Sequence, residues 1–216
     1  MYTLLVVGIG IVGALLGWIL GYRKASRRSE DIERAAHLDK LTGLFDRAIV
    51  ENAIDDATKS GVNLTIGVCD VNGLHDINES LGHAAGDQLL LAVSHRLLDL
   101  LPEGEGLVAR TGGDEFWIAT SQSPQSLVDA YTSDIDGLAH RASVGVASSP
   151  QNGSPRHAVL CADLAMYSAK SSHTPAMIYN QSTMGTPEEQ NEGLPEEIKY
   201  EHRHHERRQK ERRKRA

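Results

Sequence analysis

Between residues 38 and 180, short apolar runs alternate with stretches in which apolar residues recur every three or four positions. The recurrence is typical of helices, whereas short runs rich in branched residues between polar turns are typical of buried strands. The pattern predicts helices at 42–60, 84–101, 126–131 and 158–171. It predicts strands at 64–71, 107–110, 116–120, 142–147 and 176–179.

This order of elements predicts an α+β domain with a mostly antiparallel central sheet flanked by helices. Five residues that include Gly112 and Gly113 separate the second and third strands, which indicates a hairpin. Neither an internal repeat nor a second core is visible, so we expect a single domain at 38–180.

The first 22 residues differ from this body. Residues 3–22 form an uncharged run of twenty residues, close to the ~20 that a helix needs to cross a bilayer. A cleaved signal peptide would place basic residues before the apolar run and a small-residue cleavage site after it, whereas here the basic residues follow the run. We therefore expect a retained anchor at 1–22, a single pass through the inner cell membrane, and a cytoplasmic domain after it.

Two features of the amino-terminal region favour a homodimer. Gly13, Gly17 and Gly21 recur every fourth residue, and small residues at this spacing let membrane helices approach closely, although glycine is also common in such helices generally. Residues 23–37 carry a weak coiled-coil pattern, which is equally consistent with a solvated linker helix. We expect this linker helix to join the anchor to the domain.

Charge is distributed unevenly within a formal net charge of −7. The first 28 residues carry four basic residues and no acidic one, and residues 203–216 carry eight basic and two acidic, so the middle of the chain carries the remaining −17. This acidic body excludes a uniformly basic nucleic-acid binder, and we expect no specific DNA binding. The two cysteines also argue against a disulfide-stapled secreted module.

Residues 181–216 are rich in charge and lack apolar periodicity, which predicts a disordered tail. We expect its basic end, 203–216, to contact the anionic membrane surface, at roughly 1 kcal/mol per basic residue. A solvated tail, RNA binding and docking on the acidic body are alternatives. Metal capture by His202, His204 and His205 is a weaker one.

Three acidic residues lie at the end of a predicted strand and in the predicted hairpin turn, where they could bind a cation. Asp70 ends an apolar strand, and Asp114 and Glu115 occupy the hairpin turn. A carboxylate beside a buried strand is costly unless a cation or hydrogen bonds compensate it. If the hairpin pairs with the 64–71 strand, the three acids meet at one sheet edge, where their oxygens suit Mg²⁺. The absence of side chains at Gly112 and Gly113 would let backbone N–H groups approach a phosphate. A plain solvated turn is the alternative interpretation.

Residues 110–116, RTGGDEF, resemble the signature of the GGDEF family of diguanylate cyclases. Three further blocks follow the family's order: DKLTGLFDR at 39–47, DVNGLHDINESLGHAAGD at 70–87, and ASVGVA with ADLAMYSAK within 142–170. Together the blocks cover residues 38–179. The resemblance implies the palm-like fold of nucleotidyl cyclases.

The resemblance also implies an activity. Members of the family condense two GTP molecules into cyclic di-GMP and release two pyrophosphates, with one GTP held by each protomer of a dimer. It implies Mg²⁺ as the cofactor, bound by Asp70, the carbonyl of Val71, Asp114 and Glu115. It further implies that Asp114 and Glu115 are catalytic, with Asp114 as the proton acceptor.

Substrate-binding roles are implied in the same way. Asn78 and Asp87 resemble the pair that recognises guanine, because an amide and a carboxylate together satisfy the guanine edge. His83 belongs to the same block, but it could equally pack in the turn before the next helix. Lys170 resembles a phosphate-binding lysine, although without the resemblance it would be interpreted as an exposed lysine at a helix end.

The sequence departs from the family at several positions. His75 stands where a lysine is usual and Thr174 where an arginine is usual, so positive charge near the phosphates is reduced. Asn72 replaces a common aspartate, which we expect to be tolerated. Residues 103–106 read EGEG in place of the product-inhibition motif, so we expect no feedback through that site. We expect an active enzyme with weakened GTP affinity. The alternative is a catalytically silent module that binds GTP or cyclic di-GMP and regulates a partner.

Overall fold

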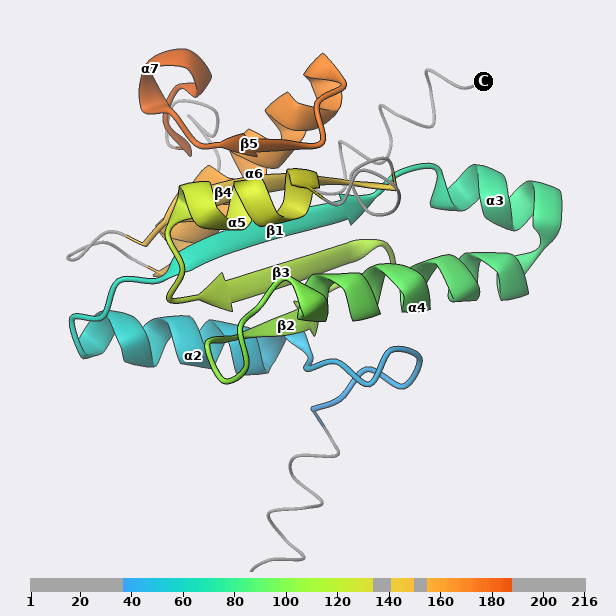
Figure 1. The fold of residues 1–216 in the computed structure, drawn as a ribbon, viewed down its shortest axis with the longest axis horizontal. Coiled ribbons are helices and arrows are strands. Elements are labelled where there is room, and N and C mark those ends of the chain that lie inside the picture. The colour runs from blue at the N-terminus through green and yellow to red at the C-terminus, as the bar shows by residue number, and fades with distance from the viewer. Residues whose placement is uncertain (1–36, 134–140, 150–154, 188–216) are drawn as a thin grey trace, which may run out of the picture. The chain divides into compact units, whose positions relative to one another are not determined.

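The computed structural model describes residues 37–133, 141–149 and 155–187, and a five-stranded sheet forms its centre (Figure 1). The strands are β1 (Thr65–Val71), β2 (Gly106–Arg110), β3 (Glu115–Thr120), β4 (Ala142–Ser148) and β5 (Ala176–Ile178). Their order is β2-β3-β1-β4-β5, and all neighbours are antiparallel except β4 and β5, which are parallel. The predicted α+β fold with a mostly antiparallel sheet is confirmed.

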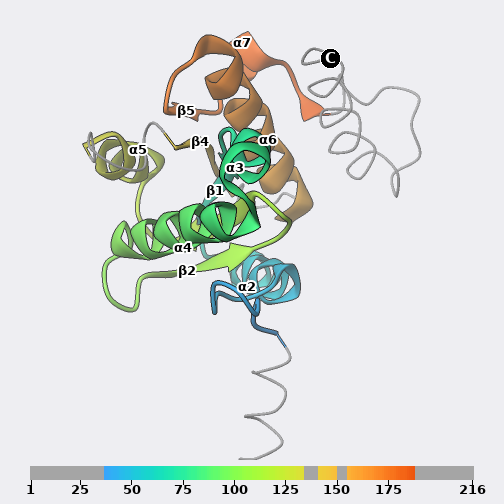
Figure 2. The ribbon, with the colours of Figure 1, turned by 90° about the vertical axis from the view of Figure 1, so that its right-hand side faces the viewer.

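Helices cover both faces of the sheet. They are α2 (Arg47–Lys59), α3 (Leu74–Leu81), α4 (His83–Asp99), α5 (Pro124–Ser133), α6 (Pro155–Ser172) and α7 (Gln181–Met184). Figure 2 shows α4 and α5 on one side of the sheet and α2 and α6 on the other.

The side-chain alternation of the strands divides the core into two layers. Successive side chains of a strand point to opposite faces. On β1, Cys69 and Val71 therefore pack with α4 and α5, whereas Ile66 and Val68 pack with α2 and α6. The second cysteine, Cys161 on α6, is also buried, and both cysteines are free thiols. Asp70 lies between Cys69 and Val71, so it faces the α2 and α6 side.

The close approach of α6 to the sheet depends on a glycine in β4. A Cβ atom at Gly145 would lie 1.9 Å from the backbone nitrogen of Met166 and 2.0 Å from the carbonyl oxygen of Ala162. Real Cβ atoms do not approach other heavy atoms so closely, so only glycine fits here. This contact holds α6, and with it Lys170, against the sheet.

The structure differs from the predicted elements in three places. Helix α3 was not predicted: it has only eight residues, none of them fully buried, with Leu74, Ile77 and Leu81 at helical spacing. It is bounded by Gly73 and Gly82, both with positive φ. The first helix begins at Arg47 rather than 42, because residues 39–44 form a turn and the side chain of Asp46 caps the helix through the N–H of Ile49. A one-turn helix, α7, occupies the beginning of the range that was predicted to be disordered.

Several expectations fall on residues outside the described ranges. These are the anchor at 1–22, the linker helix up to residue 36, and the tail beyond 187 with its histidines and basic end. Among the described residues, no helix has the length and apolar character needed to cross a membrane.

Candidate functional site

The end of β1 and the hairpin turn between β2 and β3 lie side by side. Asp70 is paired with Glu115 in the antiparallel register, and the N–H of Val71 donates to the carbonyl oxygen of Asp114 at 2.9 Å. The sheet therefore brings three acidic residues to one edge from segments more than 40 residues apart in sequence. This juxtaposition is the one expected if the hairpin pairs with the 64–71 strand.

Asp70 is held by a lysine from α6. The Nζ of Lys170 donates to the Oδ1 of Asp70 at 2.5 Å, and both side chains are largely buried. Burial raises the pKa of Asp70 to about 7, and the charges of Asp114 and Glu115 act in the same direction, whereas Lys170 lowers it. Burial therefore disfavours the charged form of Asp70, which a bound cation would favour. The interpretation of Lys170 as an exposed helix-end lysine is wrong.

Glu115 lies deeper than the other acids. Only 7% of its surface is exposed, and its Oε1 accepts a hydrogen bond from the indole Nε1 of Trp117 at 2.9 Å. Trp117 is itself 1% exposed, and the guanidinium carbon of Arg47 lies 5.2 Å from the centroid of its ring. No role for Trp117 was predicted from the sequence. The available signal was the two-residue spacing, which places Trp117 and Glu115 on the same face of β3.

The donor set suits Mg²⁺ without forming a complete cage. Carboxylate and carbonyl oxygens are the ligands that this ion prefers. Among the described residues, however, no group of three or more His, Cys, Asp or Glu side chains is arranged to hold a metal. Mg²⁺ is usually held by one or two carboxylates together with water and substrate phosphates, so an incomplete protein shell fits its chemistry. The four ligands Asp70, Val71, Asp114 and Glu115 stay a prediction.

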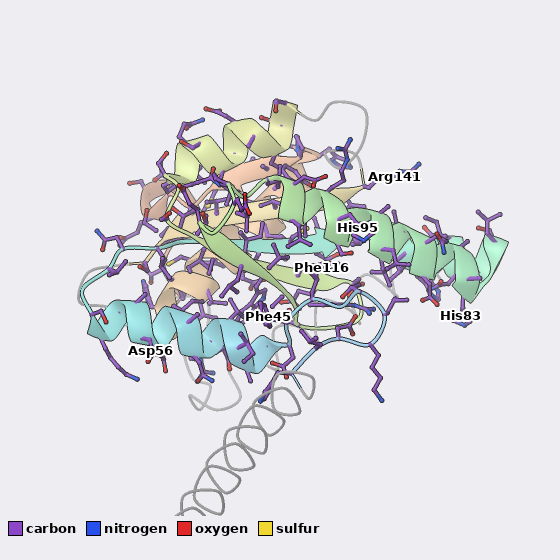
Figure 3. The ribbon with its side chains drawn as sticks, turned by 60° about the horizontal axis from the view of Figure 1, so that its bottom comes forward. Phe45, Asp56, His83, His95, Phe116 and Arg141 are labelled. Carbon is purple, nitrogen blue, oxygen red and sulfur yellow. The ribbon has the colours of Figure 1, made fainter. Side chains whose placement is uncertain are left out.

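The helical pair α3–α4 positions the two residues expected to recognise guanine. The Oδ1 of Asn78 would lie 2.0 Å from a Cβ atom at Gly86, so the amide occupies the space that glycine leaves on α4. The next residue of α4 is the exposed Asp87. His83, at the start of α4, is exposed, and Figure 3 shows it at the far tip of this pair, away from the strands. Packing of His83 within the turn is therefore wrong, and its role in substrate binding stays a prediction.

The two departures from the family add no cation to this edge. His75 is exposed on α3, and its Nε2 lies 3.0 Å from Oε1 of Glu79 on the same helix. The N–H of Thr174 donates to the carbonyl oxygen of Ala169 at 3.0 Å, which only closes the end of α6. The expected weakening of GTP affinity stays a prediction.

The glycines of the hairpin turn provide space. A Cβ atom at Gly113 would meet nothing within 4 Å, so the turn is open on that side. Neither Gly112 nor Gly113 has a positive φ, so the backbone conformation does not itself require glycine. The absence of a side chain keeps the turn accessible to a ligand, which agrees with a phosphate contact through the backbone.

An arginine joins the hairpin turn to the turn at residues 39–44. The Nη1 of Arg110 lies 3.0 Å from Oδ1 of Asp39, and its Nη2 donates to the carbonyl oxygen of Gly113 at 2.8 Å. The same Asp39 oxygen accepts from the N–H and hydroxyl of Thr42, each at 2.8 Å. Burial alone would raise the pKa of Asp39, but the hydrogen bonds from Thr42 and the charge of Arg110 outweigh it, so the pKa is lowered.

This lowered pKa predicts an acid-sensitive contribution to stability. Asp39→Asn is expected to reduce the free energy of unfolding at pH 7 by about 1 kcal/mol, because it removes the charge from several hydrogen bonds. A carboxyl whose pKa is lower in the folded state stabilises the fold fully at pH values above its unfolded pKa of about 3.9. This stabilisation is lost as pH falls through the folded pKa. Urea unfolding should therefore show the two proteins converging below about pH 4.

Asp56→Asn is the matched control, because Asp56 is exposed on α2 and its nearest cation, Lys59, is 3.6 Å away. It should change stability little at either pH. A stability difference for Asp39→Asn that persists undiminished in acid would contradict the role assigned to the charge.

Comparison with known proteins gives consistent results. The sequence model described as "Diguanylate cyclase, GGDEF domain" matches residues 36–175. The chain is 37% identical over 159 residues to the cyclic di-GMP phosphodiesterase PdeR of Escherichia coli, covering 67% of this chain and 24% of that protein. It is 30% identical over 182 residues to the probable diguanylate cyclase DgcC of the same species, covering 75% and 48%. The chain thus spans less than half the length of both relatives.

Solved structures share the fold. The coiled coil and GGDEF domain of DgcB from Caulobacter crescentus, in complex with cyclic di-GMP, matches with a TM-score of 0.63 at 19% identity, covering 78% of this chain and 98% of that one. The GGDEF domain of TpbB from Pseudomonas aeruginosa matches with a TM-score of 0.54 at 30% identity, covering 67% and 95%. The expected palm-like arrangement of sheet and helices agrees with both.

Proposed function

The chain belongs to the GGDEF family of diguanylate cyclases, and from this premise we propose that it condenses two GTP molecules into cyclic di-GMP and releases two pyrophosphates. The observation that carries the proposal is the meeting of β1 with the hairpin turn, which aligns Asp70 with Glu115 and Val71 with Asp114. It places carboxylates and the open Gly112–Gly113 turn at the same edge. A triphosphate with its cation needs both.

The acidic residues hold the cation and accept the proton. Asp70 and Glu115 are the deeper carboxylates, and with Asp114 and the carbonyl of Val71 they would hold Mg²⁺. When bound, the ion supplies positive charge that stabilises the developing charge on the phosphates. Asp114 lies in the open turn and is partly exposed, so it is the carboxylate best placed to accept the proton of the ribose hydroxyl. Lys170 lowers the pKa of Asp70 against the effect of burial and offers a cation to an incoming phosphate.

The α3–α4 pair selects the base. Asn78 offers an amide and Asp87 a carboxylate, and together they match the donors and acceptors on the guanine edge. Adenine would leave these groups unpaired, which is costly in a site built to hydrogen-bond its substrate.

Replacing Gly86 tests this selection. Gly86→Ala places a methyl group 2.0 Å from the Oδ1 of Asn78 and must displace the amide. We expect kcat/KM for GTP to fall about tenfold, the equivalent of one well-formed hydrogen bond. In the Asn78→Ala background, Gly86→Ala should cost little more, because the clash with the amide is gone and the remaining contact, at 3.1 Å, is with the flexible end of Leu74. Additive losses in the double variant would contradict the proposed coupling.

The reaction needs two copies of the chain. Each copy holds one GTP, so we propose a homodimer whose two sites face each other, brought together by an anchor at 1–22 and the linker after it. The uncharged run at 3–22 supports this placement at the inner membrane, with the domain in the cytoplasm and the basic end 203–216 on the anionic surface.

The direct test is incubation of the purified, dimeric full chain with GTP and Mg²⁺, followed by chromatography of the nucleotides. Cyclic di-GMP and pyrophosphate should appear together and should require the metal. Intact GTP after prolonged incubation would defeat the proposal. It would favour the second candidate, a silent module that binds nucleotide and regulates a partner, which the pairing of His75 with Glu79 supports.

A further inference from the structure

Glu115 is held by a neighbour on its own strand, and this contact has a consequence for metal binding. Trp117 is buried, and its indole N–H donates to the Oε1 of Glu115 at 2.9 Å. Across the sheet, Glu115 is paired with Asp70 and Trp117 with Val68, so the indole lies on the apolar side of the acidic edge. The indole N–H therefore reaches Glu115 from the core side of the sheet.

We propose that Trp117 is a positioning residue that fixes the carboxylate of Glu115 for a divalent cation. An indole N–H can only donate, and here its acceptor is the Oε1 of Glu115. It holds Oε1 and thereby sets the direction in which Oε2 points. The inference rests on the proposed function only in taking Glu115 as a metal ligand.

A purely structural role must be distinguished from this one. A buried indole N–H needs an acceptor, and Glu115 could serve only that need. In that case, loss of the N–H would change stability but not metal affinity. If Trp117 instead orients a ligand, its loss should weaken the metal, because partners that orient metal ligands typically contribute 10–100-fold in affinity.

Trp117→Phe tests the difference, since it keeps an aromatic ring and removes the donor. The measurement is calorimetric titration of Mg²⁺ into the full chain, in the presence of a GTP analogue with a methylene group between its α and β phosphorus atoms. This analogue cannot react, so the readout does not depend on turnover. We expect the Kd for Mg²⁺ to rise about tenfold or more in Trp117→Phe.

Arg47→Met is the matched control. It removes the guanidinium that lies over the indole ring but leaves the N–H of Trp117 in place. We expect a lower Tm, because the cation–π contact is lost, and a Kd for Mg²⁺ within about twofold of wild type, because the N–H is kept. Equal weakening in both variants would mean that packing around the ring is responsible, which would overturn the proposal.

A second measurement covers the case in which Trp117→Phe does not fold. The chain has two tryptophans, so a ¹⁵N spectrum holds two indole resonances, and that of Trp117 should shift when Mg²⁺ and the analogue are added. No shift, or an unchanged Kd in Trp117→Phe, overturns the proposal, as does a wild type that binds no Mg²⁺. A wild type that binds Mg²⁺ as expected but forms no cyclic di-GMP would defeat the proposed function and leave this inference standing.

Discussion

Glu115→Gln is expected to reduce cyclic di-GMP formation at least a thousandfold without unfolding the domain. Glutamine has nearly the same size and keeps a carbonyl oxygen that can accept from Trp117, so the buried contact at 2.9 Å survives. It removes the negative charge that would bind the cation. Metal stabilisation of phosphate charge is worth several kcal/mol, and about 4 kcal/mol corresponds to a thousandfold in rate.

The measurement is the initial rate of product formation at saturating GTP, over a range of Mg²⁺ concentrations. Glu103→Gln provides the control, because it removes the same charge from an exposed position ahead of β2. It should retain wild-type activity. A Glu115→Gln protein that keeps more than a tenth of the wild-type rate would show that the charge at this position is not essential, and the assignment of Glu115 as a ligand would fail.

Gly145→Ala is expected to have the largest effect on stability. Its Cβ atom would lie within 2.0 Å of backbone atoms of α6, and neither a helix backbone nor a central strand can yield like a flexible side chain. Overpacking of a core costs typically 1–3 kcal/mol, and a clash with backbone lies at or above the upper end. Because domains are stable by only about 5–15 kcal/mol, a large part of the stability would be lost.

Urea denaturation followed by circular dichroism measures this loss as a lower midpoint. Gly113→Ala is the control for the substitution itself, because a Cβ atom there meets nothing within 4 Å and the φ of Gly113 is not positive. It should unfold near the wild-type midpoint. A Gly145→Ala protein of wild-type stability would mean that α6 can move away from the sheet, and the rigid placement of Lys170 would then be wrong.

The sequence was sufficient to predict helices and strands wherever buried residues recur in a periodic pattern. The strands and the long helices α4 and α6 carry apolar residues at regular spacing, and the glycines of the hairpin mark its turn. Helix α3 was missed because it is only eight residues long and its apolar residues are at most half-buried, so its pattern is short. Residues 42–44 were predicted as the start of a helix but belong to the turn at 39–44. The shape of this turn depends on Asp39, Thr42 and Arg110, and the last of these is 71 residues away from Asp39.

The candidate site could likewise be predicted only in part from the sequence. The meeting of Asp70 with Asp114 and Glu115 could be expected once the hairpin was paired with β1, because strand pairing fixes which ends coincide. The hydrogen-bond partners of these acids could not be predicted in this way. Lys170 reaches Asp70 across 100 residues of chain, and the niche for Asn78 exists only because Gly86 faces it from another helix. Such contacts arise from tertiary packing, which no local pattern encodes.

The burial of both cysteines makes the chain convenient for labelling. Cys69 and Cys161 are its only two thiols, and burial raises the pKa of Cys69 far above its ordinary value, which disfavours the reactive thiolate. A thiol-directed spin label should therefore react with neither cysteine in the native protein. A cysteine introduced at the exposed Leu81 would be the one reactive position, and the separation of two such labels would report directly how a pair of α3–α4 tips is spaced as nucleotide is added.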